Sequence, residues 1–106
     1  MKKKKLAERI IETNSLWERT NKSVIADNVE RYLYAKYPES QKSYKAKMEK
    51  MQEISGLKKD TVYAWVNRSR EEAKVPFIKL CALAVDLGVD IEDMLIETNG
   101  GKHDDN

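Results

Sequence analysis

The sequence has few of the residues that build disulfides, metal sites and catalytic centres. Its 106 residues include one cysteine, Cys81, and one histidine, His103. A lone cysteine forms no internal disulfide, which favours a reducing, cytoplasmic location. His103 lies in a polar tail, so the sequence offers neither a multi-histidine zinc site nor the usual general base. With no glycine-rich phosphate loop and no convincing pair of carboxylates, we expect no metal, no cofactor and no enzymatic activity.

Long apolar runs are missing as well. Glu8, Arg9 and Glu12 interrupt the apolar residues that follow the Lys2 to Lys5 run, so we expect neither a signal peptide nor a membrane span. The chain has only two prolines and four glycines, and its valine, isoleucine and threonine residues do not alternate with polar ones as strands require. The sequence therefore predicts an all-α protein.

Charge is abundant but unevenly distributed. Residues 1–80 contain nineteen lysines and arginines against eleven acids, a balance of +8, whereas residues 81–106 contain one lysine against seven acids, a balance of −6. A basic body with an acidic end suits a polyanionic partner. An ordinary solvated surface explains the same charges equally well, so charge alone leaves the choice open.

Apolar residues recur at helical spacing along most of the chain. Residues 1–20 are predicted to be a basic helical extension in which Leu6, Ile10 and Trp17 share one side. The segment 98–106 lacks apolar residues, and we expect it to be a disordered tail. The intervening domain, residues 21–97, is predicted to contain five helices. The first runs over about 24–37, the second begins after Ser40 or Ser43 and stops at Gly56, and the third runs over about 58–67. The fourth starts near Pro76 and stops at Gly88, and the last holds Ile91, Met94 and Leu95.

Capping and breaking residues set the expected ends of these helices. Pro38 ends the first, because the residue before a proline avoids helical geometry. Ser40 or Ser43 is expected to cap the second, Gly88 to end the fourth, and Asp90 to cap the fifth. The helix before Gly88 is apolar nearly all round, so we expect it at the centre of the core. Residues expected to face inward from the second helix are Tyr44, Met48, Met51 and Ser55.

The stretch from Met51 to Trp65 is the most informative part of the chain. Gly56 permits the positive φ that lets a chain leave a helix sharply, and Leu57 then fills the corner. Val62 and Trp65, three residues apart, are expected to fasten the next short helix to the core. Another face of that helix would then be left outside, formed by Lys58, Lys59, Asp60, Tyr63, Ala64 and Asn67.

This arrangement resembles the Cro and lambda-repressor type of helix-turn-helix family, also called the XRE family, over about residues 25–96. The residues at family spacing are Gly56-Leu57, Thr61-Val62, Trp65, Pro76, the run from Leu80 to Val89 and the run from Ile91 to Leu95. The resemblance implies a five-helix domain that binds double-stranded DNA, usually as a two-fold homodimer on a pseudo-palindromic operator. The recognition helix would begin at Lys58 and enter the major groove.

Two residues depart from the family pattern. Gln52 stands where members usually have a small residue, so its side chain must run outward or the helix crossing must open. Met48 stands where many members have a glutamine that touches phosphate, which a thioether does poorly. Lys47 or Lys50 is expected to supply that phosphate contact.

The outward residues of the recognition helix are the expected base contacts. Lys58 and Lys59 can donate to guanine O6 and N7. Asp60 either accepts from cytosine N4 or only complements the helix dipole. Tyr63 offers a ring to a thymine methyl and a hydroxyl to phosphate, and Asn67 can pair with adenine or contact the backbone.

Phosphate contacts are expected mainly around the end of that helix. Arg68 and Arg70 are the best candidates, although they would look the same as ordinary charged loop residues. Thr61 can donate to a phosphate oxygen from within the helix. Together with Lys47 and Lys50, these residues complete the predicted DNA interface.

Three functions fit these features. The first is a sequence-specific transcription regulator, a repressor of a phage, plasmid or other mobile element by analogy with small members of the family. The second is an antitoxin-like interaction protein in which Leu6, Ile10 and Trp17 dock on a protein partner. The third is an accessory DNA binder for replication or conjugation. In all three, Trp65, Met48 and Cys81 are expected to be core residues without a chemical role.

Overall fold

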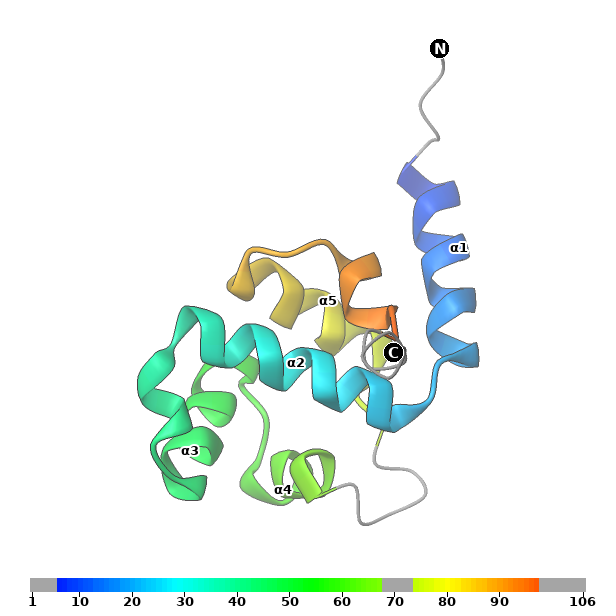
Figure 1. The fold of residues 1–106 in the computed structure, drawn as a ribbon. Helices are drawn as coiled ribbons and strands as arrows, with labels where there is room; N and C mark the ends of the chain where they lie inside the picture. Colours follow the sequence, from blue (N-terminus) through cyan, green and yellow to red (C-terminus); the bar gives the residue numbers. More distant parts are fainter. Residues whose placement is uncertain (1–5, 68–73, 98–106) are drawn as a thin grey trace, which may run out of the picture.

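The protein is described by a computed structural model that covers residues 6–67 and 74–97, without the side chains of Leu6 and Asn67. These residues form five α-helices and two short 3-10 helices, and no strand (Figure 1). The α-helices are α1 (Leu6–Arg19), α2 (Lys22–Lys36), α3 (Tyr44–Ser55), α4 (Lys59–Asn67) and α5 (Phe77–Leu87), and the 3-10 helices are η1 (Pro38–Gln41) and η2 (Ile91–Leu95). The predicted all-α class is confirmed. The last predicted helix is η2, since five residues between Asp90 and the extended Ile96 form only 3-10 turns.

Local side-chain and backbone chemistry explains where the helices begin and end. Ser43 caps α3, with its Oγ accepting a hydrogen bond from the backbone N–H of Ala46 at 3.0 Å. Ser40 is buried instead and donates to the carbonyl of Tyr37 at 2.7 Å. Gly56 and Gly88 end α3 and α5 in the left-handed region, at φ +70° and +73°. Both glycine predictions are therefore confirmed, and Ser43 is the capping serine.

One hydrophobic core joins the elements from α2 to η2. On α5, Leu80, Leu83 and Leu87 are buried, but Ile78 and Val85 are exposed. The prediction that this helix lies at the centre of the core therefore holds for one of its sides only, since the other side carries exposed residues. The buried core residues are Ile25, Val29, Leu33, Met48, Met51, Val62, Trp65, Val75, Leu80, Leu83, Ala84, Leu87, Met94 and Leu95.

A buried asparagine fastens the C-terminal segment to α2. The side-chain amide of Asn28 donates to the carbonyls of Met94 and Ile96, at 2.9 and 2.8 Å, and its Oδ1 accepts from Arg31. All the polar groups of this side chain are thus paired, which makes its burial tolerable. Asp90 was expected to cap the last helix with its side chain, but it makes no such hydrogen bond, and only its carbonyl accepts from the N–H of Asp93.

The helix α1 lies to one side of this body, and its N-terminal end reaches beyond it in Figure 1. Its C-terminal half is attached through Trp17, whose indole N–H donates to the carbonyl of Val75 at 2.7 Å. The Trp17 ring also lies 6.3 Å from the Phe77 ring. Nearer its start, Arg9 pairs with Glu92 at 2.9 Å. Trp17 therefore contacts this chain itself, whereas Ile10 remains half exposed.

No helix within residues 6–67 and 74–97 combines the length and the apolar character that crossing a bilayer requires.

Candidate nucleic-acid interface

The residues between α3 and α4 form a tight corner. The N–H of Gly56 donates to the carbonyl of Gln52 at 2.9 Å, and the N–H of Leu57 donates to the Ser55 hydroxyl at 3.2 Å. Leu57 is partly buried against the core, as expected for a residue that fills the corner. Gln52 is itself only partly buried. The helix α4 then begins at Lys59, one residue later than predicted.

The short helix α4 is held by its inward side chains. Val62 is fully buried and Trp65 is only 3% exposed, so both are core residues as predicted. Ala64 was expected on the outer face, but it is 7% exposed, and this prediction is wrong. The buried face of α4 is therefore wider than the spacing of Val62 and Trp65 indicates. It includes Ala64, whose short side chain does not extend to the protein surface.

Four of the predicted base-contact residues lie on the outside of this corner. Lys58, Lys59 and Asp60 are exposed, and the part of the chain that the structure describes places no ion-pair partner beside any of them. Tyr63 is also exposed, one turn after Lys59 and therefore on the same face. Two exposed lysines, Lys58 just before α4 and Lys59 in its first turn, thus lie near a half-exposed aromatic ring, with the carboxylate of Asp60 in the same turn.

Tyr44 joins this surface from α3, which the sequence did not indicate. Periodicity placed it on the inward face with Met48, yet its side chain is 48% exposed because the core ends before the first turn of α3. Its ring lies 6.4 Å from that of Tyr63, at an interplanar angle of 88°. Tyr44 is therefore a surface residue beside Tyr63 that the helical pattern alone assigns wrongly to the core.

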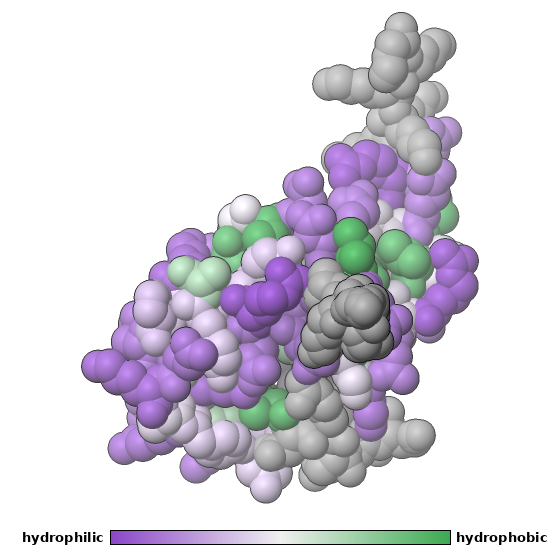
Figure 2. Space-filling view, viewed as in Figure 1, coloured by the Kyte–Doolittle hydropathy of each residue, from purple (hydrophilic) through white to green (hydrophobic). Residues whose placement is uncertain are grey.

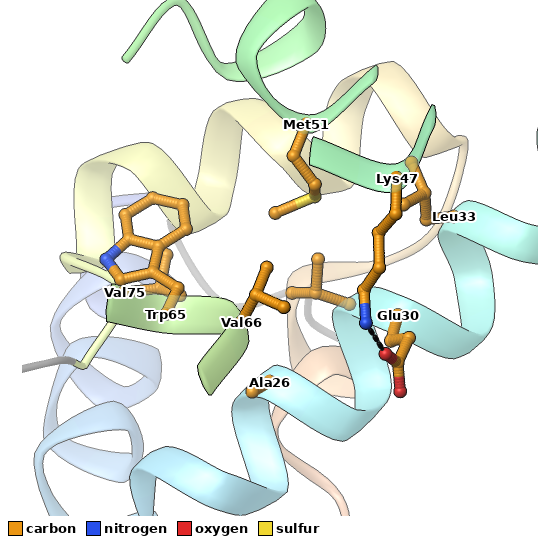
Figure 3. A pocket seen from close by; sticks show the side chains of 9 residues that line it. Ala26, Glu30, Leu33, Lys47, Met51, Trp65, Val66 and Val75 are labelled. Carbon is orange, nitrogen blue, oxygen red and sulfur yellow. Dashed lines mark hydrogen bonds and ion pairs between the residues drawn. The ribbon is translucent and has the colours of Figure 1, made fainter. Parts of the chain in front are cut away.

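The two lysines expected to bind phosphate from α3 are already engaged. The side chain of Lys47 is 14% exposed and forms an ion pair with Glu30, drawn as a dashed line in Figure 3. Lys50 is 19% exposed, and its ammonium donates a hydrogen bond to the Glu53 carboxylate at 3.1 Å, which raises the pKa of Lys50. A second acid, Glu39, lies 3.8 Å from the same ammonium. Each lysine would have to leave these partners to contact a phosphate.

The ion pair of Lys47 lies at the rim of a small apolar cleft between α2, α3 and α4. The cleft has a volume of about 20 Å³, which holds no more than one water molecule. It therefore has no room for an organic effector behind α4. The apolar residues that line it are Ala26, Val29, Leu33, Met51, Trp65, Val66 and Val75 (Figure 3).

The remaining predicted contacts lie around the end of α4. Thr61 is partly buried in the first turn of the helix. Asn67 is its last residue, but its side chain lies outside what the structure describes, as do Arg68 and Arg70. The described residues contain no group of histidine, cysteine or carboxylate side chains able to hold a metal ion.

Hydrophilic residues cover most of the surface over α3 in the view of Figure 2. This surface and the outer face of α4 belong to the same corner of the molecule, at the lower side of Figure 1.

No protein-family model, curated protein or solved structure matches this chain.

Proposed function

We propose that this protein is a sequence-specific, double-stranded DNA-binding transcription regulator, a dimeric repressor that places α4 in the major groove of a pseudo-palindromic operator. The observation that carries the proposal is the two-sided build of α4. Val62 and Trp65 fix its inner side in the core, while Lys59 on its outer side and Lys58 just before it are exposed. A rigid helix that presents cations and hydrogen-bonding groups outward suits a groove lined by base edges and phosphates.

Each exposed residue of α4 has a role in this proposal. Lys58 and Lys59 donate to guanine O6 and N7, or to the phosphates beside them. Asp60 accepts from a cytosine amino group, and Tyr63 places its ring on a thymine methyl. Asn67, at the last position of α4, pairs with an adenine or with the backbone.

The phosphate contacts come from outside the base-reading face. Arg68 and Arg70 follow α4 directly in the sequence, and Thr61 can donate from its first turn. Lys47 and Lys50 contribute less, because Glu30 and Glu53 already pair with them. No part of this proposal requires a cofactor or a catalytic step.

Selection of bound duplexes from a random pool tests the proposal, followed by binding measurements on variants. Lys59→Ala should weaken binding to the selected duplex roughly tenfold, the effect of losing one base contact, and leave the melting temperature unchanged. Lys79→Ala, which removes a lysine on α5, should bind as the wild type does. If the protein prefers no duplex at near-physiological salt, or if both lysine variants lose affinity equally, the proposal is wrong.

Salt dependence separates phosphate contacts from base contacts in the same assay. Arg68→Ala should weaken binding to all sequences and reduce the slope of log affinity against log salt by about 0.9. Lys47→Met should change this slope less, because its charge is neutralised by Glu30 before DNA arrives. An unchanged slope for Arg68→Ala would remove Arg68 from the phosphate contacts.

A second candidate function is an interaction protein that uses α1, in the manner of an antitoxin. Ile10 and Ile11 on α1 and Ile78 on α5 are exposed, and they line one shallow hollow. Exposed apolar patches of this kind are typical of protein contact sites. Ile11→Ser combined with Ile78→Ser should abolish such a contact while DNA binding persists, and loss of both together would speak against a separate surface.

A further inference from the structure

The five tyrosines fall into two groups by what their rings contact. Tyr32, Tyr34 and Tyr37 each have a cation over the ring, at 4.5, 5.7 and 4.5 Å from Arg31, Lys47 and Lys50 respectively. Tyr44 and Tyr63 lie against each other, from two different helices, on the proposed DNA-binding side. The first group is part of the body of the protein, whereas the second is a pair of half-exposed rings at its surface.

The position of Tyr44 follows from how α3 begins. The Ser43 cap makes Tyr44 the first residue of α3, one turn before the buried Met48. The turn that carries Tyr44 therefore extends past the core, and its ring meets the ring of Tyr63 instead of core side chains. About half of each side chain stays exposed, 48% for Tyr44 and 50% for Tyr63, so the contact covers only part of each ring.

The geometry of the pair restricts what it can recognise. Rings at 88° to each other contact edge to face, which is a favourable arrangement for aromatic pairs and limits the rotation of both side chains. Such a pair offers no two parallel ring faces for successive unpaired bases, which is how single-stranded nucleic acids are bound. In the major groove of a duplex, the apolar feature that a ring edge can contact is the methyl group of thymine.

We infer that Tyr44 is a positioning residue that holds the ring of Tyr63 against a thymine methyl group, so that the operator requires thymine at that position. This inference rests on the proposed DNA-binding function. Tyr44 restricts the side chain of Tyr63 before DNA binds, so Tyr63 loses less conformational entropy on binding. The contact between Tyr63 and the thymine methyl group is therefore stronger than Tyr63 would make alone. Lys59 lies one turn before Tyr63 on the same face of α4. Its contact with the DNA would fix the position of α4 relative to the base pairs.

The test uses a duplex selected by the full chain from a random pool, together with copies in which each thymine in turn is replaced by uracil. Uracil lacks only the 5-methyl group. At one position the replacement should weaken wild-type binding roughly fivefold, an effect of the size of one aromatic contact. Tyr44→Ala should bind the thymine duplex about as weakly and respond little to the uracil replacement. Tyr44→Phe keeps the ring contact and should behave as the wild type does.

A double-mutant cycle completes the test. In a Tyr63→Ala background, Tyr44→Ala should cause no further loss of affinity, because the residue it positions is gone. Independent losses from the two variants, an equal uracil effect with and without Tyr44, or the absence of any sensitive thymine would each overturn the inference. Tighter binding to a single strand of the same sequence would also overturn it. A wild-type protein that prefers no duplex at all would overturn the proposed function, and this inference with it.

Discussion

The helices α4 and α1 each contribute one tryptophan to their attachment to the protein, but the two attachments and the two exposed surfaces differ. Trp65 of α4 is buried in the core, as is Val62 of the same helix. Trp17 of α1 is only partly buried and is held by a hydrogen bond to the carbonyl of Val75. The outer face of α4 carries Lys59 and Asp60 beside Tyr63, whereas α1 exposes Ile10 and Ile11. The two helices also lie apart in Figure 1, with α1 at the upper right and α4 at the lower edge.

This difference indicates two kinds of surface. The outer residues of α4 are polar, so the helix is well solvated before any partner arrives and suits a hydrated, charged partner such as duplex DNA. The exposed isoleucines of α1 are poorly solvated and suit an apolar partner. The attachment differs as well, since α4 depends on buried side chains, whereas α1 depends on the partly buried Trp17 and on a few polar contacts. Substitutions that weaken the attachment of α4 should therefore lower the free energy of unfolding more than substitutions that weaken the attachment of α1.

The largest effect is expected for Trp65→Ala. Removing this buried indole leaves a cavity under α4 and should lower the free energy of unfolding by about 3–5 kcal/mol. Urea or thermal unfolding followed by circular dichroism measures the loss. Tyr63→Ala is the matched control, because it removes an aromatic ring from the exposed face of the same helix. Equal losses for the two variants would show that the inner and outer faces of α4 are assigned wrongly.

A smaller effect is expected for Trp17→Ala. The variant loses a partly buried ring and leaves the carbonyl of Val75 without its donor, which together should cost about 1–3 kcal/mol. The cation of Lys74, 4.4 Å from the ring centroid, also loses its aromatic partner. Ile11→Ala, on the exposed side of α1, should leave stability nearly unchanged. If Trp17→Ala proved as damaging as Trp65→Ala, α1 would belong to the core in the same sense as α4.

The sequence predicted the parts of the fold that depend on neighbouring residues. Gly56 and Gly88 end helices where expected, because a positive φ is a local requirement. Burial of Val62 and Trp65 also followed from helical spacing within one short helix. The recognition of a DNA-binding corner stays a prediction, since it rests on these local features and on a resemblance.

The features that the sequence did not show depend on how its helices are placed. Lys47 stays a predicted phosphate contact, but its ion pair with Glu30 on another helix is specified by no local pattern. Tyr44 follows the inward periodicity of α3 but lies where the core has ended. Asn28 gave no signal at all, because its partners Met94 and Ile96 are more than sixty residues away. Burial at a helix end and the pairing of charges depend on how the helices are placed, which periodicity does not specify.

The smallest effect is expected for the second attachment of α1, the ion pair between Arg9 and Glu92. The hydrogen bond from Arg9 lowers the pKa of Glu92 below its ordinary value. Its stabilising contribution is therefore complete above the pKa that Glu92 has in the unfolded chain, and it is lost as the pH falls through the lower pKa of the folded protein. Both side chains are substantially exposed, so the contribution is small and sensitive to salt.

Glu92→Gln should accordingly lower the melting temperature slightly near neutral pH, by less than Trp17→Ala does. The difference from the wild type should shrink as the pH falls below about 4 and disappear once Glu92 of the folded wild type is protonated. Added salt at neutral pH should shrink it as well. Glu97→Gln removes the same charge from an exposed residue of the same segment and controls for net charge. A difference that grew on acidification, or that Glu97→Gln reproduced, would mean that α1 is not attached through this ion pair and that Trp17 alone holds it.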